Sequence, residues 1–408
     1  MGYNALNIST TPDRAGNVLL TRGESIAYFG PAGGALPVPG GAAVLDCAGA
    51  AIEPGRVNAH THLYSGLVPL GMPSPEPPPR TFLEILERIW WRLDRALDER
   101  SLRASARYYT ARALLAGTTT VIDHHESPSL VEGSLDALAD ACGETGIRAI
   151  LTYGATERNG GAEEARRGLG ECRRFLQSRS RVRGMVGLHA SFTVSDGTIR
   201  EAGRLCRDMD TVLHVHVAED GADVEDARRR GYAGPLERLL ELDGLPAGSV
   251  LAHGVHLDRE QVRRAGDLGM WFVQNPRSNR GNGVGYPASL AAAHKVALGT
   301  DGYPADMEAE AEALREESGA RGEDPALASR RTEAAWVLLA ERFGIAFAPL
   351  APGGAADVVV RALEGVRHVL VAGEVRVRDG ELVGVSLADL EAEARAEAAR
   401  LWERMGGR

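Results

Sequence analysis

Cysteine is scarce in this sequence, and apolar runs long enough to cross a bilayer are missing. The four cysteines (Cys47, Cys142, Cys172 and Cys206) are widely spaced and form neither a CxxC pair nor a zinc-knuckle pattern. They predict buried thiols in a reducing compartment rather than a disulfide framework. No run approaches the ~18 apolar residues that a membrane span requires. The segment MGYNALNISTTPDRAG also lacks the basic-then-apolar order of a signal peptide, so we expect a cytoplasmic protein with no membrane partner.

Lysine is almost absent, because Lys295 is the only one and nearly all of the basic charge is arginine. Lys and Arg together number 46 against 56 acidic residues, which leaves a formal net charge of −10. A chain this acidic lacks the basic surface that binds nucleic acid or anionic lipid. We therefore expect no nucleic-acid partner.

Short apolar runs alternate with longer stretches of helical periodicity over residues 53–344. Eight such runs each predict a strand: RVNAHTH, TTTVIDHH, IRAILTY, VRGMVGLHA, TVLHVHVAE, SVLAHGVH, MWFVQNP and KVALGTDG. Eight strands alternating with helices predict an α/β fold, a (β/α)8 TIM-like barrel.

The two ends of the chain have a different pattern. Residues 1–52 and 345–385 contain short apolar runs cut by glycine and proline, which predict strands. We expect them to pair into a small β-sandwich side domain built from both chain ends. Residues 386–408 predict a closing helix packed on the barrel or the sandwich. The proline-rich segment 72–80 is either a lid over the barrel mouth or a plain linker.

Histidine gathers at the predicted strand ends. In VNAHTHL, His60 and His62 are two positions apart, so in a strand both imidazoles point to the same face. Of the 11 histidines, only His294 and His368 lie away from the ends of predicted barrel strands. The remaining candidates at these ends are Asp123, His124, His125, His189, His214, His216, Glu219, His253, His256, Asn275 and Asp301.

Such a cluster is typical of a metal site. Neutral imidazoles and a carboxylate suit Zn²⁺ or Fe²⁺ and leave an open position for water. The bound water would then have a pKa near ~7. A second carboxylate nearby could shuttle protons.

The motifs HTH at the first strand, HxHxxE at the fifth, a histidine at the sixth and TDG at the eighth resemble the amidohydrolase superfamily. The resemblance covers nearly the whole chain. Within the superfamily it is closest to the deaminase and chlorohydrolase branch, and there to the SsnA-like aminohydrolases. The stretches TTTVIDHHESP, HVHVAED and NPRSNRGNGVGY carry that closer similarity.

The resemblance implies roles for particular residues. His60, His62, His216 and Asp301 would bind one divalent metal ion, with Zn²⁺ favoured over Fe²⁺. Glu219 would shuttle protons, His253 would orient the attacking water, and Asp301 would also accept the proton of that water. The implied reaction is hydrolytic deamination of a purine-, pterin- or pyrimidine-like heterocycle by metal-bound hydroxide, with release of ammonia. The alternative is hydrolysis of another C–N or C–Cl bond, in a cyclic amide or triazine-like ring. The family also implies a homodimer.

The position of the single lysine indicates which kind of metal site is present. Relatives with two metal ions bridge them through a carboxylated lysine at the fourth strand, where this sequence has His189, and Lys295 lies at the start of the eighth strand. A lysine-bridged pair of ions cannot be built, which favours a mononuclear site.

Other residues have two open interpretations. His125, Arg158 and His189 are candidates for substrate binding, and each has a structural alternative. We expect His214 to face the helices rather than the metal. We expect Asn275, Ser278 and Asn279 to fix the loop after the seventh strand, and the pair Trp90–Trp91 to pack in the core or an interface.

Overall fold

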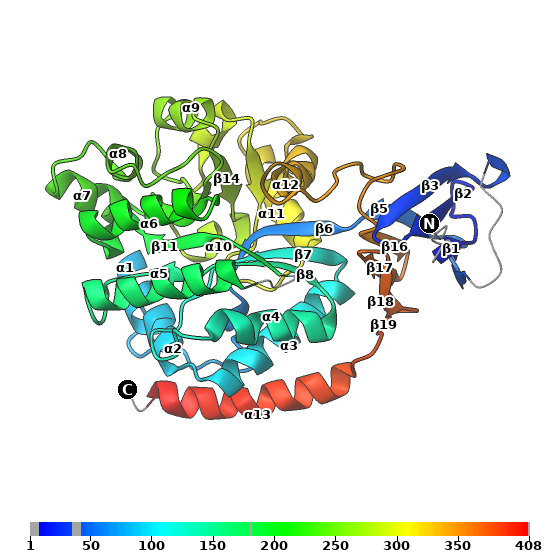
Figure 1. Cartoon of the computed structure of the whole chain (residues 1–408), viewed down its shortest axis with the longest axis horizontal. Helices are drawn as coiled ribbons and strands as arrows, with labels where there is room; N and C mark the ends of the chain where they lie inside the picture. The colour runs from blue at the N-terminus through cyan, green and yellow to red at the C-terminus, as the bar shows by residue number, and fades with distance from the viewer. Residues whose placement is uncertain (1–7, 35–41, 179–181, 407–408) are drawn as a thin grey trace.

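The computed structural model describes residues 8–34, 42–178 and 182–406. Figure 1 shows a large barrel with its helices, a small all-β unit beside it, and the C-terminal helix lying along the barrel's outer surface. Parts of the predicted side domain, residues 1–7 and 35–41, lie outside the described residues.

The barrel consists of parallel strands that follow one another around its wall. They are β6 (Arg56–Thr61), β7 (Thr118–Asp123), β8 (Arg148–Leu151) with β9 (Gly154–Ala155), β11 (Val186–Ala190), β12 (Leu213–Val217), β13 (Val250–His253), β14 (Trp271–Gln274) and β15 (Val296–Leu298). A short strand, β10 (Arg183–Gly184), pairs with β8. The predicted (β/α)8 fold is confirmed, and each of the eight predicted runs contains one of the barrel strands.

Helices follow the strands and cover the barrel. They are α1 (Phe82–Ile85), α2 (Trp91–Ala96), α3 (Glu99–Leu115), α4 (Ser134–Thr145), α5 (Ala162–Gln177), α6 (Asp196–Asp208), α7 (Gly221–Arg229), α8 (Pro235–Glu241), α9 (Arg259–Asp267), α10 (Pro276–Gly281), α11 (Met307–Gly319), α12 (Leu327–Phe343) and α13 (Leu387–Gly406). One π-helical turn, η3 (Leu86–Trp90), joins α1 to α2. In the described parts of the chain, no helix has the length and apolarity needed to span a membrane.

The small unit is a sandwich of two sheets. One contains β1 (Ile8–Thr10), β2 (Asn17–Arg22), β3 (Ser25–Pro31) and β4 (Ala43–Leu45), and the other contains β5 (Ala51–Pro54), β16 (Val358–Ala362), β17 (Gly365–Val371), β18 (Glu374–Arg378) and β19 (Glu381–Leu382). The antiparallel pairing of β5 with β16 joins the two ends of the chain. Buried side chains such as Leu19, Ile26 and Val358 form one cluster between the sheets.

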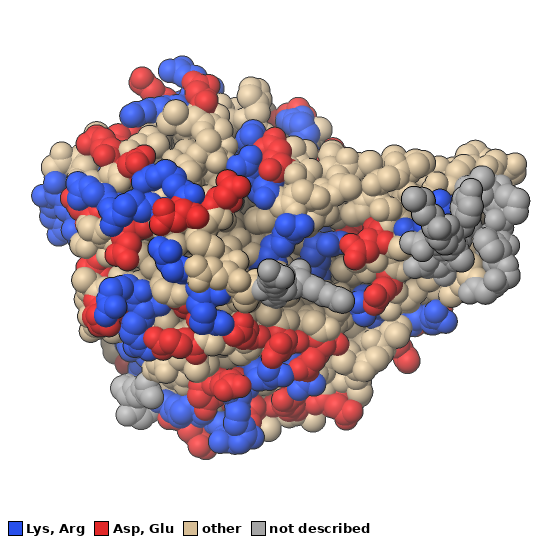
Figure 2. Space-filling model, viewed as in Figure 1, with Lys and Arg blue, Asp and Glu red and all other residues tan. Residues whose placement is uncertain are grey.

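Charged side chains cover the outside of the barrel. On the face drawn in Figure 2, arginines and acidic residues are interspersed.

The barrel closes where β15 meets β6. The main-chain N–H groups of Thr300 and Asp301 both donate to the carbonyl oxygen of His60, at 2.9 and 3.0 Å. The side chain of Asn58 spans the same seam, since its Nδ2 donates to Thr300 Oγ1 at 2.7 Å and its Oδ1 accepts from Thr300 N at 3.1 Å. The first and last strands of the barrel therefore hold His60 next to Asp301.

The sandwich is tied to the barrel through Asp357, which is buried just before β16. Its carboxylate accepts hydrogen bonds from Nε and Nη2 of Arg148, at the start of β8, at 3.1 and 2.9 Å. It also accepts from the main-chain N–H of Ala372 at 2.7 Å. The carboxylate is inaccessible and the Arg148 side chain is only 21% exposed, so removing one partner would leave the other charge uncompensated.

We expect Asp357→Ala to lower the free energy of unfolding by about 3 kcal/mol, because Arg148 would keep its charge without its partner. Urea denaturation of wild type and variant measures this loss. Glu132→Ala is the control, because it breaks an exposed ion pair with Arg167 and should cost less than about 1 kcal/mol. Equal small losses in the two variants would contradict the prediction.

Candidate metal centre

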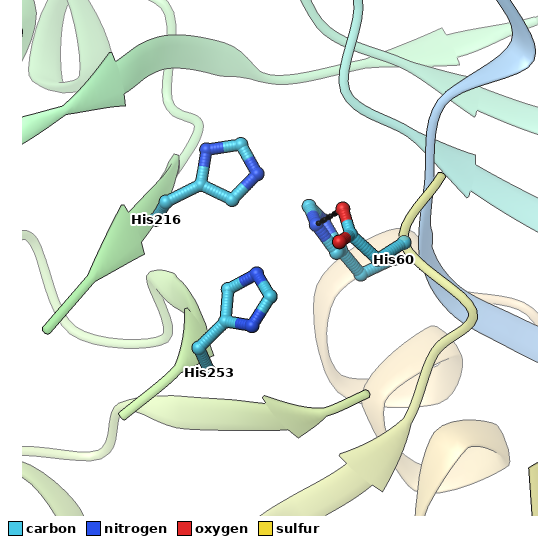
Figure 3. Close-up of side chains that lie close together, drawn as sticks. His60, His216 and His253 are labelled. Atoms are coloured by element: carbon cyan, nitrogen blue, oxygen red, sulfur yellow. Dashed lines mark ion pairs between the residues drawn. The ribbon is translucent and has the colours of Figure 1, made fainter. Parts of the chain in front are cut away.

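The ends of two strands, β6 and β12, and the loop after β15 bring four predicted metal ligands together. His60 lies on β6 with His62 just beyond it, His216 lies on β12, and Asp301 follows β15. His62 Nε2 is 2.8 Å from Asp301 Oδ1, and His60 Nε2 is 3.4 Å from the same oxygen. His216 Nε2 lies 3.4 Å from His62 Nε2. Figure 3 shows the rings of His60, His216 and His253 converging on one space from different strands.

These separations suit a single small cation. Ligand atoms held tetrahedrally 2.0–2.1 Å from zinc lie about 3.4 Å apart. One ligand atom from each of His60, His216, His253 and Asp301 also falls in a group whose members all lie within 4.8 Å of one another. Nε2 of His60 is fully buried and forms no hydrogen bond with the described residues, so it is available to a metal ion.

The charges around the cluster also favour a cation. Burial lowers the pKa of His60 to about 3, which keeps this imidazole neutral and able to bind metal. Burial would raise the pKa of the Asp301 carboxyl, but the neighbouring imidazoles of His60 and His62 hold it well below its usual value. Burial acts to lower the pKa of His62, yet Asp301 and Glu126 raise it to about 9. The site therefore attracts a positive charge between His62 and Asp301.

Each ligand histidine has its other ring nitrogen occupied. Nδ1 of His62 lies 2.5 Å from the carbonyl oxygen of His124, and Nδ1 of His216 lies 2.6 Å from that of His189. Nδ1 of His60 is 2.9 Å from Nε2 of His214. These contacts leave every Nε2 directed at the common space.

The prediction that His214 faces the helices is wrong. Its side chain lies inside the barrel beneath His60 and is fully buried. The physical reason is the two-residue period of a strand, since His214 and His216 are two positions apart on β12 and so share a face.

Strained backbone surrounds the cluster. Ala218, His253 and Asp301 have φ values of 49°, 75° and 52°, in the left-handed region that non-glycine residues rarely adopt. All three lie at or just beyond the ends of barrel strands. Such conformations each cost about 1–3 kcal/mol and concentrate at functional sites.

Glu219 and His253 face each other beside the metal ligands, with His253 Nε2 3.5 Å from Glu219 Oε2. Burial raises the pKa of the Glu219 carboxyl to about 7, although His253 opposes the shift. A carboxyl that titrates near neutral pH is suited to both giving and taking a proton.

Asn275, which directly follows β14, and Ser278 and Asn279 of the next helix, α10, have a larger role than the one predicted for them. Asn279 Oδ1 lies 2.9 Å from His253 Nδ1, and Ser278 Oγ donates to the Asp301 carboxylate. Asn275 Nδ2 lies 3.4 Å from His253 Nδ1. These side chains orient the site rather than only fixing their own loop. The sequence motif contains them, but contacts across more than 20 positions are not visible in it.

A cavity opens from the metal cluster toward solvent. Aromatic rings line it, from Tyr64, Phe82, Trp90, Trp91 and Phe192. Carboxylates also line it, from Asp94, Glu126, Glu219, Asp220, Asp223 and Asp301. His62, His189, His216 and Asn282 add further polar groups. Within the parts of the chain that the structure describes, no Lys or Arg lines it. Trp90 and Trp91 pack against apolar clusters, as expected, and both also line the cavity.

The predicted substrate-binding residues occupy different places. His189 lines the cavity. Arg158 lies behind the wall, where its Nη2 is 2.7 Å from Asp94 Oδ2 and its guanidinium stacks 4.8 Å from the Trp91 ring.

His125 lies outside the lining of this cavity, which favours its structural alternative over substrate contact. Its Nε2 is 2.7 Å from Ser127 Oγ, and its ring packs against Tyr153. The next residue, Glu126, reaches the cavity instead and lies 2.7 Å from His124 Nδ1. Glu126 is not among the site residues predicted from the sequence. Its position after two histidines at a strand end was the available signal.

Comparison with known proteins gives concordant results. The amidohydrolase family profile matches residues 51–369. The chain is 29% identical to an 8-oxoguanine deaminase of Pseudomonas aeruginosa over 95% of both chains. It is 28% identical to a 5′-deoxyadenosine deaminase of Methanopyrus kandleri, over 81% of this chain and 82% of that one.

Solved structures share the fold. A zinc-bound adenosine deaminase from Xanthomonas campestris superposes with a TM-score of 0.83 at 20% identity, over 98% of each chain. A zinc complex of an atrazine chlorohydrolase from Arthrobacter aurescens gives a TM-score of 0.77 at 22% identity, over 96% of this chain and 100% of that one.

The metal ligands predicted from the sequence include His62, whereas the group of four close ligand atoms in the structure has His253 in its place. The other three members, His60, His216 and Asp301, are the same in both sets. We expect His62→Asn to lose the metal, because His62 contacts both Asp301 and His216. We expect His253→Asn to retain about one equivalent, because Asn279 and Glu219 hold that ring to one side. Metal content after loading with zinc and gel filtration measures both. The reverse pattern would assign His253 as the ligand.

Proposed function

The chain belongs to the amidohydrolase family, and on that premise we propose that it is a metal-dependent aminohydrolase. It removes an amino group from a nitrogen heterocycle by hydrolysis and releases ammonia. The substrate is purine-, pterin- or pyrimidine-like, with the scissile C–N bond in a cyclic amidine. The observation that carries the proposal is Glu219, a carboxyl with a pKa of about 7 next to three histidines and an aspartate. The deaminase relatives support the same reaction.

One divalent ion would be held by His60, His62, His216 and Asp301. The zinc in both structural neighbours supports Zn²⁺ over Fe²⁺. Two other groups of potential ligands lie nearby, and each takes a histidine from the predicted site: one is His62 with His124 and Glu126, and the other is His216 with Glu126 and His189. That overlap favours a single ion. When bound, the ion would supply Lewis acidity and lower the pKa of a water molecule toward ~7.

The protein's own groups would move the protons. Asp301, held anionic by its histidine neighbours, would take the proton that the attacking water releases. Glu219 would protonate a ring nitrogen and then assist departure of the amino group. His253, with Nδ1 fixed by Asn279, would direct Nε2 toward the reacting carbon and orient the water.

The cavity supports a flat substrate rich in N–H groups. Aromatic rings from Tyr64, Trp91 and Phe192 can stack on a planar heterocycle. Oδ1 of Asp94 is buried and makes no hydrogen bond to the described residues, so it can accept one from substrate. His189 completes this wall.

Three further expectations accompany the proposal. The protein would act in the cytoplasm, would form a homodimer, and would be nearest in kind to the SsnA-like aminohydrolases. The four cysteines support a reducing compartment, because all are free and buried.

Zinc-loaded protein should release ammonia from at least one compound in a panel of purines, pterins, pyrimidines and triazines, and a chelator should abolish the release. Ammonia, chloride and ring-opened acids are measured in parallel. Chloride or a ring-opened acid without ammonia would replace deamination by the alternative reaction. No product from any compound would contradict the proposal.

Replacing Glu219 by glutamine should reduce kcat by about 10²–10⁴-fold, because the amide cannot transfer a proton. Metal content should be unchanged. Asp220→Asn is the matched control, since Asp220 lines the same cavity but caps α7 by accepting from Ala222 N at 2.9 Å, as asparagine also can. A Glu219→Gln enzyme as active as this control would exclude Glu219 as the proton shuttle.

A further inference from the structure

We infer that His214 is a positioning residue for the metal ligand His60, and that it fixes which nitrogen of His60 carries the hydrogen. The inference rests on the metal site of the proposed function. His214 lies one layer deeper in the barrel than the ligands and touches neither the cavity nor the predicted ion site.

The three ligand histidines are held in two different ways. Nδ1 of His62 and Nδ1 of His216 each meet a main-chain carbonyl oxygen, at 2.5 and 2.6 Å. A carbonyl oxygen can only accept, so both rings carry hydrogen on Nδ1, and in the neutral form of each ring the lone pair is on Nε2. These partners come from the backbone and do not depend on side-chain identity.

His60 has no such carbonyl, and its Nδ1 instead meets Nε2 of His214 at 2.9 Å. If His60 binds a metal through Nε2, its Nδ1 must donate, and Nε2 of His214 must accept. The hydrogen of His214 then lies on Nδ1, an atom that is buried and has no hydrogen-bond partner in the described structure. The opposite arrangement would put a hydrogen on Nε2 of His60, where the metal must bind.

The position of His214 is rigidly determined. The residue is on β12, two positions before His216, and is fully buried. Its ring stands at 71° to that of His60 and at 79° to that of His124, with centroids 4.9 Å apart in both cases. Loss of such a supporting hydrogen bond typically weakens metal binding by about 10–100-fold.

Three substitutions separate the hydrogen bond from simple packing. In His214→Gln, the amide oxygen can reach about where Nε2 lies, whereas the shorter side chain of His214→Asn cannot. His214→Phe keeps a ring but offers no acceptor. The matched control is His125→Phe, another buried barrel histidine, whose Nε2 contacts Ser127 and no predicted ligand side chain.

Each protein is stripped of metal and titrated with Zn²⁺ and Co²⁺ against a competing chelator, with unfolding of the metal-free form measured alongside. We expect His214→Phe and His214→Asn to bind about 10–100-fold more weakly, and His214→Gln to stay within about threefold of wild type. His125→Phe should bind metal like wild type, even if its metal-free form is less stable.

The outcomes separate the two proposals. If wild type itself binds no metal, the proposed function fails and the role of His214 fails with it. If wild type binds but the Phe and Asn variants bind equally well, or Gln is as weak as Asn, the role of His214 is overturned while the metal site stands. Should His214→Phe not fold, the comparison of Gln with Asn decides alone.

Discussion

The hydrogen bonds that close the barrel between β6 and β15 are the constraint on which the site depends. The carbonyl of His60 accepts from both Thr300 and Asp301, so the imidazole and the carboxylate that we propose as metal ligands are joined through the backbone. The side chains of Asn58, Tyr109 and Thr300 form a polar network in the same seam. Because the closure is built into the sheet, the spacing between these two ligands does not rely on a flexible loop. The other strands then need only the correct register to place His216 and His253 opposite.

Burying this many imidazoles is unfavourable unless other interactions compensate. The structure compensates by keeping some of the rings neutral and by placing carboxylates beside the others. Desolvation keeps His60 and His216 neutral, which is the form that binds a metal. The negative charge of Asp301 then attracts a cation to the centre of the cluster. Glu126 lies on the far side of His62 and is held anionic against the effect of burial by His124. The same burial that disfavours charge on the histidines raises the pKa of Glu219 to about 7, so one environment prepares both the ligands and the proton carrier.

Much of this arrangement could be predicted from the sequence, for a physical reason. Strands and helices of the barrel have periodic patterns, and parallel strands in a barrel end at one rim, so residues such as His60 and Asp301 could be brought together without coordinates. The sequence did not reveal contacts between side chains that lie far apart along the chain. Asn279 reaches His253 only because the helix after β14, α10, folds back over the rim. The error at His214 has a different origin, since the two-residue period of the strand was available and was misapplied.

One side of the cavity wall, which contains Phe82, Trp90 and Trp91, is less predictable than the metal cluster because it comes from a single irregular segment. Helices α1 and α2 are joined by the π-helical turn η3, and the extra residue in that turn changes which side chains face inward. Ordinary helical periodicity would therefore misplace Trp90 and Trp91. Gly302, next to the ligand Asp301, shows how closely this segment approaches the site, because a β-carbon there would lie 2.8 Å from the Trp90 ring. The metal side of the site is thus fixed by the barrel itself, whereas the ring-binding side can change by altering one segment that packs against it. That division allows members of one family to keep the same chemistry and differ in the heterocycle they accept.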